Sequence, residues 1–513
     1  MLFNILTLLG GLVAFATANQ TRIPRCCNAL QSIDELRGKV YLPGSDTYAD
    51  RMETYFSKSA ALEPWCMLLP STAEDVSLIV KDLVANNCPF GVRSGGHSSH
   101  PLSNSVEKGI TIDFAFISGH MNATTWNPDT GLVSIQPGGR WQDVYDVLTP
   151  HGITVAGGRA GSVGVGGFLS GGGISFFAAS HGWACDTIAN YEVVLADGSI
   201  AYANAQDNPD LWQALKGAGA NLGLVTRFDM FPIELAGPSE GIIWGGNMIF
   251  GSESGSDLIN ALVDFTDNVY KDENSSASVS FSYQPKLAGG MVGLVSIENT
   301  LGLSKPKAFN GFYGIGAALN DTTRIDTMSA LSRELSEGQP MGFRNMFITA
   351  SFKNDPRPMK YALDKVNKLN AELEEITLTL SANFTTVYTV QPVTKSIIEK
   401  SIAKGGNVMG LDRYVDDGNG ILFLLIVSTD HAEVERLAIP RAEALVRDVE
   451  AYAKELDLER EWKYLNYAHG SQDAIATVGE EALGKLQAAS AKYDPHRVFQ
   501  RLRTSGFKIP RDK

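Results

Sequence analysis

Two glycine-rich segments constrain this chain more than any other feature of its sequence. The first, at residues 94–98, reads Ser-Gly-Gly-His-Ser after a short apolar stretch typical of a strand, and the second spans residues 157–173. Glycine adopts positive φ and lets the backbone approach a ligand closely, so two such turns can surround a large phosphorylated cofactor with main-chain N–H groups. His97, which the first turn presents, then needs a role of its own.

The glycine spacing argues against a Rossmann-type dinucleotide site. In the run Gly164-Val165-Gly166-Gly167-Phe168-Leu169, a leucine stands where the G-x-G-x-x-G pattern requires its third glycine. No strand-turn-helix unit is expected around this run, and the chain contains no G-x-x-x-x-G-K-[ST] loop. If these glycines hold phosphates, they do so in another geometry.

Motifs at separated positions carry a resemblance to a known family. Besides the two glycine segments, the C-terminal part contains Tyr464-Leu465-Asn466-Tyr467 and Lys492-Tyr493-Asp494-Pro495. Together these motifs resemble the flavoprotein oxidases with a vanillyl-alcohol-oxidase-type (PCMH-type) FAD-binding domain, specifically the berberine-bridge-enzyme-like branch. The resemblance implies an α+β fold with two domains, a PCMH-type FAD-binding domain and a substrate domain with an antiparallel sheet backed by helices. The length of 513 residues also favours more than one hydrophobic core.

The resemblance and the composition of the chain predict five parts. The FAD-binding domain ends near Gly237-Pro238, and the last part returns from the substrate domain to the FAD-binding domain. The predicted parts are a signal peptide (1–18), an N-terminal segment (19–59), the FAD-binding domain (60–236), the substrate domain (237–458) and the C-terminal segment (459–513).

Hydrophobic periodicity predicts the helices and strands that frame the turns. Ser71-Thr72-Ala73-Glu74 is interpreted as a capping box that starts a helix with its apolar face at 76–83. A second amphipathic helix is expected from Trp141 to Leu148, and a turn at 196–199 is expected to close a hairpin. Further helices are expected at 210–216 and around 445–452, and strands at 90–93, 110–114, 132–136, 191–195, 200–203, 224–228, 293–298, 346–352 and 422–428.

The resemblance implies that FAD is the cofactor and that His97 carries it covalently through the 8α-methyl group, a bond that raises the redox potential of the flavin. Many relatives form a second bond through a cysteine, but Ala160 stands at that position here, and Cys185 lies outside the pattern. We therefore predict a single covalent link. The cofactor-binding residues implied by the resemblance are Arg93, Ser94, Gly95, Gly96, His97, Ser98, Gly158, Ser162, Val163, Gly164, Gly167, Gly173, Val225 and Asn466.

His97 and His100 also permit a different interpretation, a pair of metal ligands spaced by one helical turn. Two ligands do not complete a zinc site, and no nearby cysteine or carboxylate supplies the rest. We expect no metal.

Hydride transfer to a flavin requires a base for the proton that leaves the substrate as its C–H bond breaks. We predict Tyr464 as this base and Tyr467 as the second choice, because a tyrosinate beside an electron-poor flavin can have a lowered pKa. If residues 464–467 form a turn, both side chains can reach the site; packing in a core is the alternative role. Val163 stands where relatives with good oxygen reactivity carry valine, which favours reoxidation by O₂.

The N-terminal residues predict a secreted protein. Residues 2–16 are nearly all apolar and too short to span a bilayer, and Ala16-Thr17-Ala18 suits cleavage after Ala18. In an oxidising compartment, Cys26, Cys27, Cys66 and Cys88 can form one or two disulfides, with the pairing left open. Glycosylation sequons that agree with secretion stand at Asn19, Asn122, Asn274, Asn320 and Asn383.

The predicted function is that of a secreted FAD-linked oxidase that takes a hydride from a small organic substrate and forms H₂O₂. The net charge of −14 argues against a nucleic-acid partner, and no segment has the length of a membrane span. Ala160 favours a role in secondary metabolism over the alternative, oxidation of oligosaccharides at the anomeric carbon. A protein that keeps the fold but has lost its flavin is a further alternative, and the substrate itself is not identified.

Overall fold

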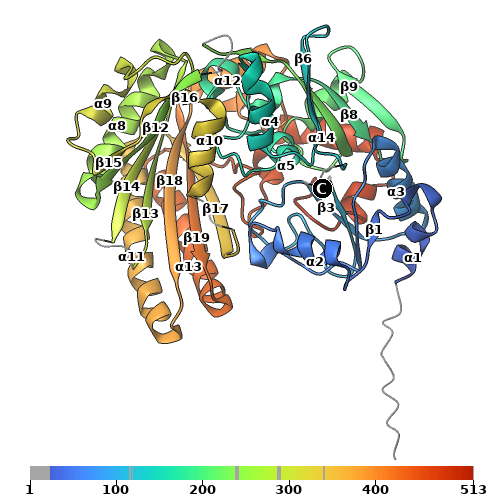
Figure 1. Ribbon diagram of the computed structural model, residues 1–513. Coiled ribbons are helices and arrows are strands. Elements are labelled where there is room, and N and C mark those ends of the chain that lie inside the picture. The colour runs from blue at the N-terminus through green and yellow to red at the C-terminus, as the bar shows by residue number, and fades with distance from the viewer. Residues whose placement is uncertain are drawn as a thin grey trace, which may run out of the picture.

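The computed structural model describes residues 24–114, 117, 119–236, 242–285, 290–338 and 341–511. A large sheet with helices on its outer side occupies one half of the molecule, and two smaller sheets occupy the other (Figure 1). The predicted α+β class with two parts is confirmed. The predicted signal peptide, the sequon at Asn19 and the boundary at Gly237-Pro238 lie outside the described residues, and the predicted domain limits stay predictions.

The first small sheet leads directly into the first glycine turn. Its strands run in the order β1-β2-β4-β3, with β3 and β2 each parallel to β4. β3 covers Phe90–Arg93 as predicted, so the turn begins at the carboxyl end of a buried strand. The other strands and the helices of this region are β1 (Val40–Tyr41), β2 (Cys66–Leu68), β4 (Ile110–Asp113), α1 (Arg25–Gln31), α2 (Asp46–Glu53) and α3 (Ala73–Ala85).

The capping box of α3 differs from the predicted one by one position. Thr72, not Ser71, is the N-cap, and its hydroxyl accepts from the N–H of Asp75 at 3.2 Å. The carboxylate of Asp75 accepts in return from the N–H of Thr72 at 3.2 Å. The prediction was wrong because aspartate, like glutamate, can close the box when it lies three residues after the cap.

The second small sheet is antiparallel, in the order β5-β6-β10-β8-β9, and contains the predicted hairpin. The predicted helix from Trp141 to Leu148 is α4, and its apolar face packs in one hydrophobic core with strands of this sheet. The strands are β5 (Thr124–Asn127), β6 (Leu132–Ile135), β8 (Ile188–Val194), β9 (Ile200–Asn204) and β10 (Leu224–Met230), and the short helices are α5 (Val165–Ser170), α6 (Ala178–His181) and α7 (Pro209–Leu215). A separate pair of strands, β7 (Ile153–Thr154) and β11 (Ile233–Glu234), lies beside it.

The large sheet has nine strands within the described residues, and all its pairings are antiparallel. The three strands predicted here are present and are longer than predicted, while their neighbours were not anticipated. The strands are β12 (Ile242–Gly251), β13 (Ser275–Tyr283), β14 (Met291–Asn299), β15 (Asn320–Asp321), β16 (Arg324–Thr327), β17 (Arg344–Lys353), β18 (Phe384–Val393), β19 (Gly420–Thr429) and β20 (Glu459–Arg460).

The two faces of this sheet differ in chemistry. Val279, Phe281 and Tyr388 point to a core that is closed by helices α8, α11 and α13 on the outer side (Figure 1). The alternate residues Ser278 and Ser280 point to the opposite face, toward the other half of the molecule. The helices of this half are α8 (Gly255–Asn268), α9 (Asn310–Tyr313), α10 (Met328–Glu337), α11 (Pro356–Leu380), α12 (Lys395–Ala403) and α13 (Ala432–Glu455).

After β20 the chain packs against the half that contains the small sheets. Helices α14 (Glu480–Tyr493) and α15 (Val498–Arg501) contribute to its cores, and Phe90 of β3 forms a parallel bridge with Arg503. Phe90 donates its N–H to the carbonyl of Leu502 at 2.9 Å. The C-terminal residues thus brace the strand that carries the first glycine turn.

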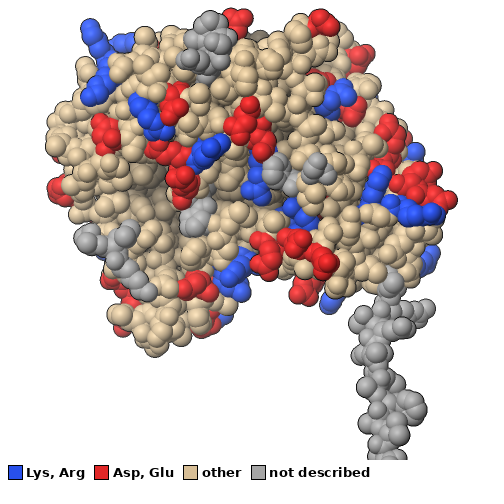
Figure 2. Space-filling model, in the orientation of Figure 1, with Lys and Arg blue, Asp and Glu red and all other residues tan. Residues whose placement is uncertain are grey.

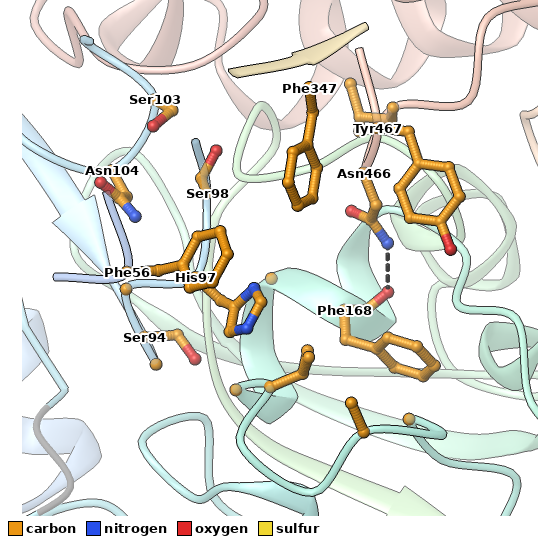
Figure 3. Close-up of a pocket in the computed structure, with 18 of the residues that line it drawn as sticks. Phe56, Ser94, His97, Ser98, Ser103, Asn104, Phe168, Phe347, Asn466 and Tyr467 are labelled. Atoms are coloured by element: carbon orange, nitrogen blue, oxygen red, sulfur yellow. Dashed lines mark hydrogen bonds between the residues drawn. The ribbon is translucent and has the colours of Figure 1, made fainter. Parts of the chain in front are cut away.

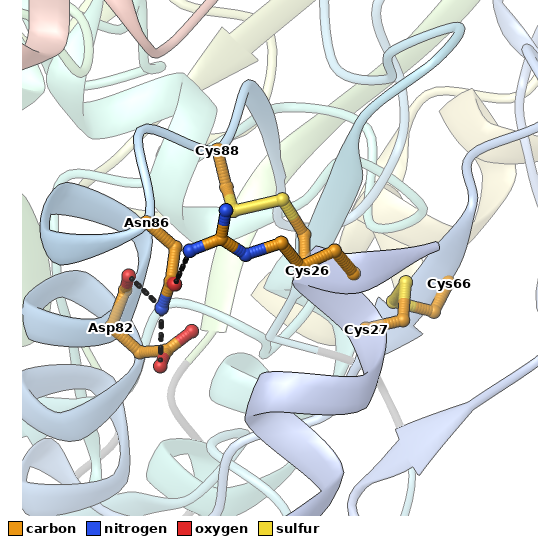
Figure 4. Close-up of a disulfide and its surroundings, with 7 residues drawn as sticks. Cys26, Cys27, Cys66, Asp82, Asn86 and Cys88 are labelled. Carbon is orange, nitrogen blue, oxygen red and sulfur yellow. Dashed lines mark hydrogen bonds between the residues drawn. A yellow bond between two sulfur atoms is a disulfide. The ribbon is translucent and has the colours of Figure 1, made fainter. Parts of the chain in front are cut away.

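Two disulfides fix the N-terminal helix α1 to this half. Cys26 pairs with Cys88 and Cys27 with Cys66, so neighbouring residues of one helix are bonded to the segment between α3 and β3 and to β2 (Figure 4). The prediction of disulfides among these four residues is confirmed, and Cys185 is free and buried.

Removing both disulfides is expected to destabilise the folded protein. A crosslink that closes a loop of tens of residues contributes about 2–4 kcal/mol by restricting the unfolded chain. Urea titration with and without dithiothreitol measures this effect in the unchanged protein, and the variant with all four cysteines replaced by alanine should show no response to the reductant. Equal stability of the unchanged protein in both conditions would speak against this contribution.

The surface in Figure 2 carries acidic and basic side chains interspersed over the face shown, without a broad basic patch. In the part of the chain that the structure describes, no helix combines the length and the apolar character needed to cross a membrane. Asn320 and Asn383 are exposed, and Asn122 and Asn274 are partly buried. Glycosylation at these sequons stays a prediction.

Candidate active site

A cavity of about 700 Å³ lies between the polar face of the large sheet and the two glycine segments. The first turn supplies Ser94 to Ser98, and the second glycine segment supplies a wall from Gly158 to Ser170 that includes α5. The C-terminal segment closes the cavity with residues 464–467 and with Arg503. A cavity of this size accommodates a large cofactor together with part of a small ligand.

The two glycine segments touch each other through their backbones. A Cβ atom on Gly95 would lie 2.5 Å from Cα and 2.7 Å from N of Gly164, and a Cβ on Gly164 would meet Gly95 equally closely. Ser94 Oγ reinforces the crossing, because it accepts from the N–H of Gly166 at 3.1 Å and donates to the carbonyl of Pro137 at 2.5 Å. Glycine is therefore required at this crossing for packing.

Replacing Gly95 by alanine is expected to cost about 3 kcal/mol of folding free energy, because the backbone on the other side cannot move aside as a flexible side chain would. The flavin content of the purified protein should fall with it. Urea unfolding and the visible spectrum measure both effects. Gly484→Ala is the matched control: nothing lies within 4 Å of the added Cβ on α14, so its stability should stay equal or rise slightly.

His97 projects from the first turn into the cavity, and its ring stacks on Phe56 with centroids 4.0 Å apart and planes at 13° (Figure 3). Its Nε2 atom is buried and has no hydrogen-bond partner among the described residues. Burial, assisted by the positive charge of Arg140, lowers the pKa of His97 to about 4. The imidazole is therefore neutral at neutral pH, the form that can act as a nucleophile.

Arg93 lies behind the turn and does not line the cavity. Its guanidinium is fully buried, where it pairs with Asp113 at 3.3 Å and donates to the carbonyl of Arg51 at 2.7 Å and to Thr54 Oγ1 at 2.6 Å. A Cβ on Gly96 would lie 2.7 Å from the Arg93 Nε atom. Arg93 thus supports the turn from below, which differs from the direct cofactor contact expected for it.

Residues 464–467 form a turn in which the N–H of Tyr467 donates to the carbonyl of Tyr464 at 2.9 Å. Both tyrosines line the cavity, and their ring centroids lie 4.8 Å apart. Asn466 donates from Nδ2 to the carbonyl of Phe168 at 3.0 Å and to the Tyr464 hydroxyl at 3.1 Å (Figure 3). This amide ties the turn to the second glycine segment.

The environment of Tyr464 is opposite to the one expected for a base. The side chain is 1% exposed, and its hydroxyl oxygen accepts from the N–H of Gly173 at 2.9 Å. Burial raises the pKa of Tyr464 well above its usual value. The protein's own groups therefore do not lower this pKa, because loss of solvent outweighs the two hydrogen bonds that stabilise the anion.

The cavity brings together most of the residues implied by the resemblance. Arg93, Ser162 and Gly173 are the exceptions: Ser162 lies just outside, where its N–H donates to Ser336 Oγ at 3.0 Å, and Gly173 lies behind the lining residue Tyr464, to whose hydroxyl oxygen it donates. Those that line the cavity are Ser94, Gly95, Gly96, His97, Ser98, Gly158, Val163, Gly164, Gly167, Val225, Tyr464, Asn466 and Tyr467.

A family model described as "FAD binding domain" matches residues 64–204, which include both glycine segments. The curated protein "FAD-dependent monooxygenase sdcF" of Emericella nidulans is 36% identical over 490 residues, covering 95% of this chain and 98% of the relative. The chain belongs to this family of FAD-linked oxidoreductases. The resemblance stated from the sequence is thereby confirmed, and the enzyme is an FAD-dependent oxidoreductase.

Two solved structures share the fold of the enzyme. A berberine-bridge-enzyme-like protein of Physcomitrella patens superposes with a TM-score of 0.71 at 17% identity, covering 96% of this chain and all of that one. The glucooligosaccharide oxidase of Acremonium strictum, which is described with a 6-S-cysteinyl, 8α-N1-histidyl FAD, superposes with a TM-score of 0.70 at 18% identity, covering 94% of this chain and 98% of that one. At this identity the likeness concerns the fold.

The residues of the enzyme fit FAD. The crossing glycine turns leave main-chain N–H groups for a pyrophosphate, and the buried guanidinium of Arg503 adds positive charge to the cavity wall. Arg503 has no carboxylate partner among the described residues and donates to Asn221 Oδ1 at 2.7 Å and to three backbone carbonyls. The unpartnered His97 nitrogen faces the same cavity. The turn at 94–98, the wall at 158–167 and Arg503 would hold the cofactor.

Sequence reasoning missed most of the wall formed by the large sheet. The resemblance did place the segment Gln391-Pro392 near the cavity, and Gln391 of β18 lines it. Phe56, Arg159 and Arg503 were not anticipated, nor was the row of hydroxyl groups on β13, β14 and β18. The alternation Ser276, Ser278, Ser280, Ser282 on β13 was the available signal, since period-two spacing of small polar residues indicates one face of a strand. The wall residues that line the cavity are Ser278, Ser280, Ser282, Leu294, Ser296, Asn345, Phe347, Thr385, Val387, Thr389, Gln391, Leu424, Ile426 and Ser428.

Proposed function

We propose that the enzyme is a secreted oxidase of secondary metabolism that removes a hydride from a small organic substrate and passes the electrons to O₂, forming H₂O₂. The observation that carries the proposal is the neutral, unpartnered His97 imidazole facing the same cavity as Tyr467. When bound, FAD supplies a two-electron acceptor for the hydride. Oxidation of an alcohol then balances as R₂CHOH + O₂ → R₂CO + H₂O₂.

We assign covalent attachment of FAD to His97 alone. Ala160 lines the cavity at the position where a second, cysteinyl bond would form, and a methyl group cannot form it. Cys185 is fully buried outside the cavity, and burial raises the pKa of its thiol well above the usual value, so it does not offer a thiolate.

Tyr467 is the favoured base in this proposal, which reverses the order expected from the sequence. Its hydroxyl oxygen accepts from a guanidinium N–H of Arg159 at 3.4 Å, which fixes the position of that oxygen at the cavity wall. Tyr464 instead orients the turn through Gly173 and Asn466. Phe347 and Phe168 line the cavity beside this turn and exclude water from it.

Secretion and reoxidation by O₂ are part of the same proposal. The two disulfides suit an oxidising compartment, and the sequons at exposed Asn320 and Asn383 suit passage through the secretory pathway. Val163 lines the cavity, where a side chain can control the approach of O₂. The alternative of an oligosaccharide oxidase is not favoured, since Ala160 removes the second flavin link of such an enzyme.

Anaerobic mixing with a panel of secondary metabolites tests the proposal. A substrate should bleach the flavin absorbance, and admission of ¹⁸O₂ should restore it with one H₂O₂ formed per substrate oxidised and no label in the product. Label in the product without H₂O₂ would instead indicate a monooxygenase, the activity for which the E. nidulans relative is named. Purified protein without any flavin would reject the enzyme assignment itself.

A further inference from the structure

The cavity wall beside Tyr467 combines a guanidinium group with a buried amide N–H group that lacks an acceptor among the described residues. The guanidinium of Arg159 lines the cavity and donates to Gln391 Oε1 and to the Tyr467 hydroxyl. Gln391 also lines the cavity and is 2% exposed. Its Nε2 atom has no hydrogen-bond partner among the described residues. A buried amide without a partner is costly, so a ligand that accepts from it would bind favourably.

The charge of the cavity is also one-sided. Arg159 and Arg503 line it, and no aspartate or glutamate is found among its described lining residues. Arg503 comes from the C-terminal segment that braces β3, and it donates to Asn221 and to backbone carbonyls. Arg159 is therefore the cation of the wall next to Tyr467 and Gln391.

Glu298 of β14 is the carboxyl group that could neutralise Arg159. It is buried near the end of β14, on the face that carries Ser296, whose Oγ donates to it, and it also faces Ser276 of β13 and Glu334 of α10, which pairs with Arg324. Burial raises the pKa of Glu298 to about 8, although the charge of Arg159 acts in the opposite direction. Below that pH the group is mostly protonated, so the positive charge of Arg159 is not offset.

We propose that Arg159 and Gln391 form an oxyanion-binding subsite, so that the substrate of this enzyme carries a carboxylate or an ionised enol or phenol. The inference rests on the proposed function, because the subsite lies in the same cavity. A guanidinium and an amide N–H can bind one oxyanion together, and such charge-assisted bonds are about twice as strong as neutral ones. The subsite would anchor the substrate beside Tyr467, and it disfavours neutral sugars as substrates.

Titration of the flavin-containing enzyme with 2-naphthoate and with the neutral isostere 2-naphthamide at pH 6.5 tests the subsite. Both ligands should perturb the flavin absorbance, with naphthoate at least about 10-fold tighter, since a hydrogen bond to a charged group contributes about 1.5–3 kcal/mol. Arg159→Met should weaken the binding of naphthoate about 10- to 100-fold by the same measure and change the affinity for naphthamide by no more than about twofold. Gln391→Leu should weaken naphthoate less.

Arg436→Met is the matched control, because it removes one positive charge from an exposed site on α13 outside the cavity wall. It should change neither affinity. Equal affinities of the unchanged enzyme for naphthoate and naphthamide would overturn the inference, and this comparison needs no variant to fold. If the protein contains flavin but does not bind naphthoate more tightly than naphthamide, only the subsite is refuted. If the protein contains no flavin, the proposed function is refuted.

The pH dependence supplies a second readout. Because the raised pKa keeps Glu298 protonated below about 8, naphthoate should bind most tightly in neutral solution and more weakly as pH rises to 9. In Glu298→Gln, which cannot ionise, this decline should disappear while naphthamide binding stays constant in both proteins. An unchanged decline in Glu298→Gln would contradict the assigned role of this carboxyl group.

Discussion

Replacing Tyr467 by phenylalanine is expected to lower the rate of flavin reduction by about 10²- to 10⁴-fold, the usual contribution of a general base. The change removes the oxygen beside Arg159 and keeps the ring that packs against Tyr464 and Phe347. Folding and flavin binding should therefore be preserved. Stopped-flow mixing without oxygen measures the reduction step separately from reoxidation.

Tyr464→Phe is the matched comparison in the same turn. It leaves the N–H of Gly173 and one donor of Asn466 without their acceptor, so it should cost about 1–3 kcal/mol of stability. Its rate of flavin reduction should fall much less than that of Tyr467→Phe. The reverse result, with Tyr464→Phe inactive and Tyr467→Phe nearly normal, would return the base to Tyr464.

Replacing His97 by alanine is expected to abolish covalent flavin completely. Bound flavin, where it remains, should be released by acid, and its redox potential should be lower than in the unchanged enzyme. The ring is poised for attachment because its pKa of about 4 leaves it neutral at neutral pH and Phe56 fixes its orientation. The covalent fraction is measured from the yellow colour retained by acid-precipitated protein.

His100→Gln is the control for this experiment, since His100 lies three residues further along the same segment. His100 packs against Phe507 and His469 at the cavity wall, so its replacement removes a nearby imidazole without touching His97. Covalent flavin should persist in this variant. Covalent flavin in His97→Ala, or loss of covalent flavin in His100→Gln alone, would contradict the assignment of the attachment to His97.

The cofactor end of the cavity was predictable from the sequence, because glycine has few structural substitutes. Gly95 and Gly164 occupy a backbone crossing where no side chain fits, and this requirement leaves a mark in the sequence. β3 and α4 were predicted with their observed bounds, since the hydrophobic residues of each follow the strand or helix period over its whole length. Both are local features.

The substrate end was not predictable, because it depends on pairings between distant segments. Arg159 and Gln391 are 232 residues apart and meet only when the large sheet packs on the glycine segment. Period-two alternation identifies the two faces of β13 but not which one meets the cofactor-binding half. The disulfide pairing was left open for the same reason: spacing alone does not say that Cys27 meets β2 and Cys26 meets the segment after α3.

The central claim, that FAD occupies this cavity and is bonded to His97, is tested most directly by peptide mapping of the denatured enzyme. Trypsin should release residues 94–108, which contain both His97 and His100. We predict that this peptide carries one FAD, and that fragment ions assign it to His97. An unmodified 94–108 peptide with all flavin in the acid supernatant, or a flavin on the peptide that contains Cys185, would contradict the account.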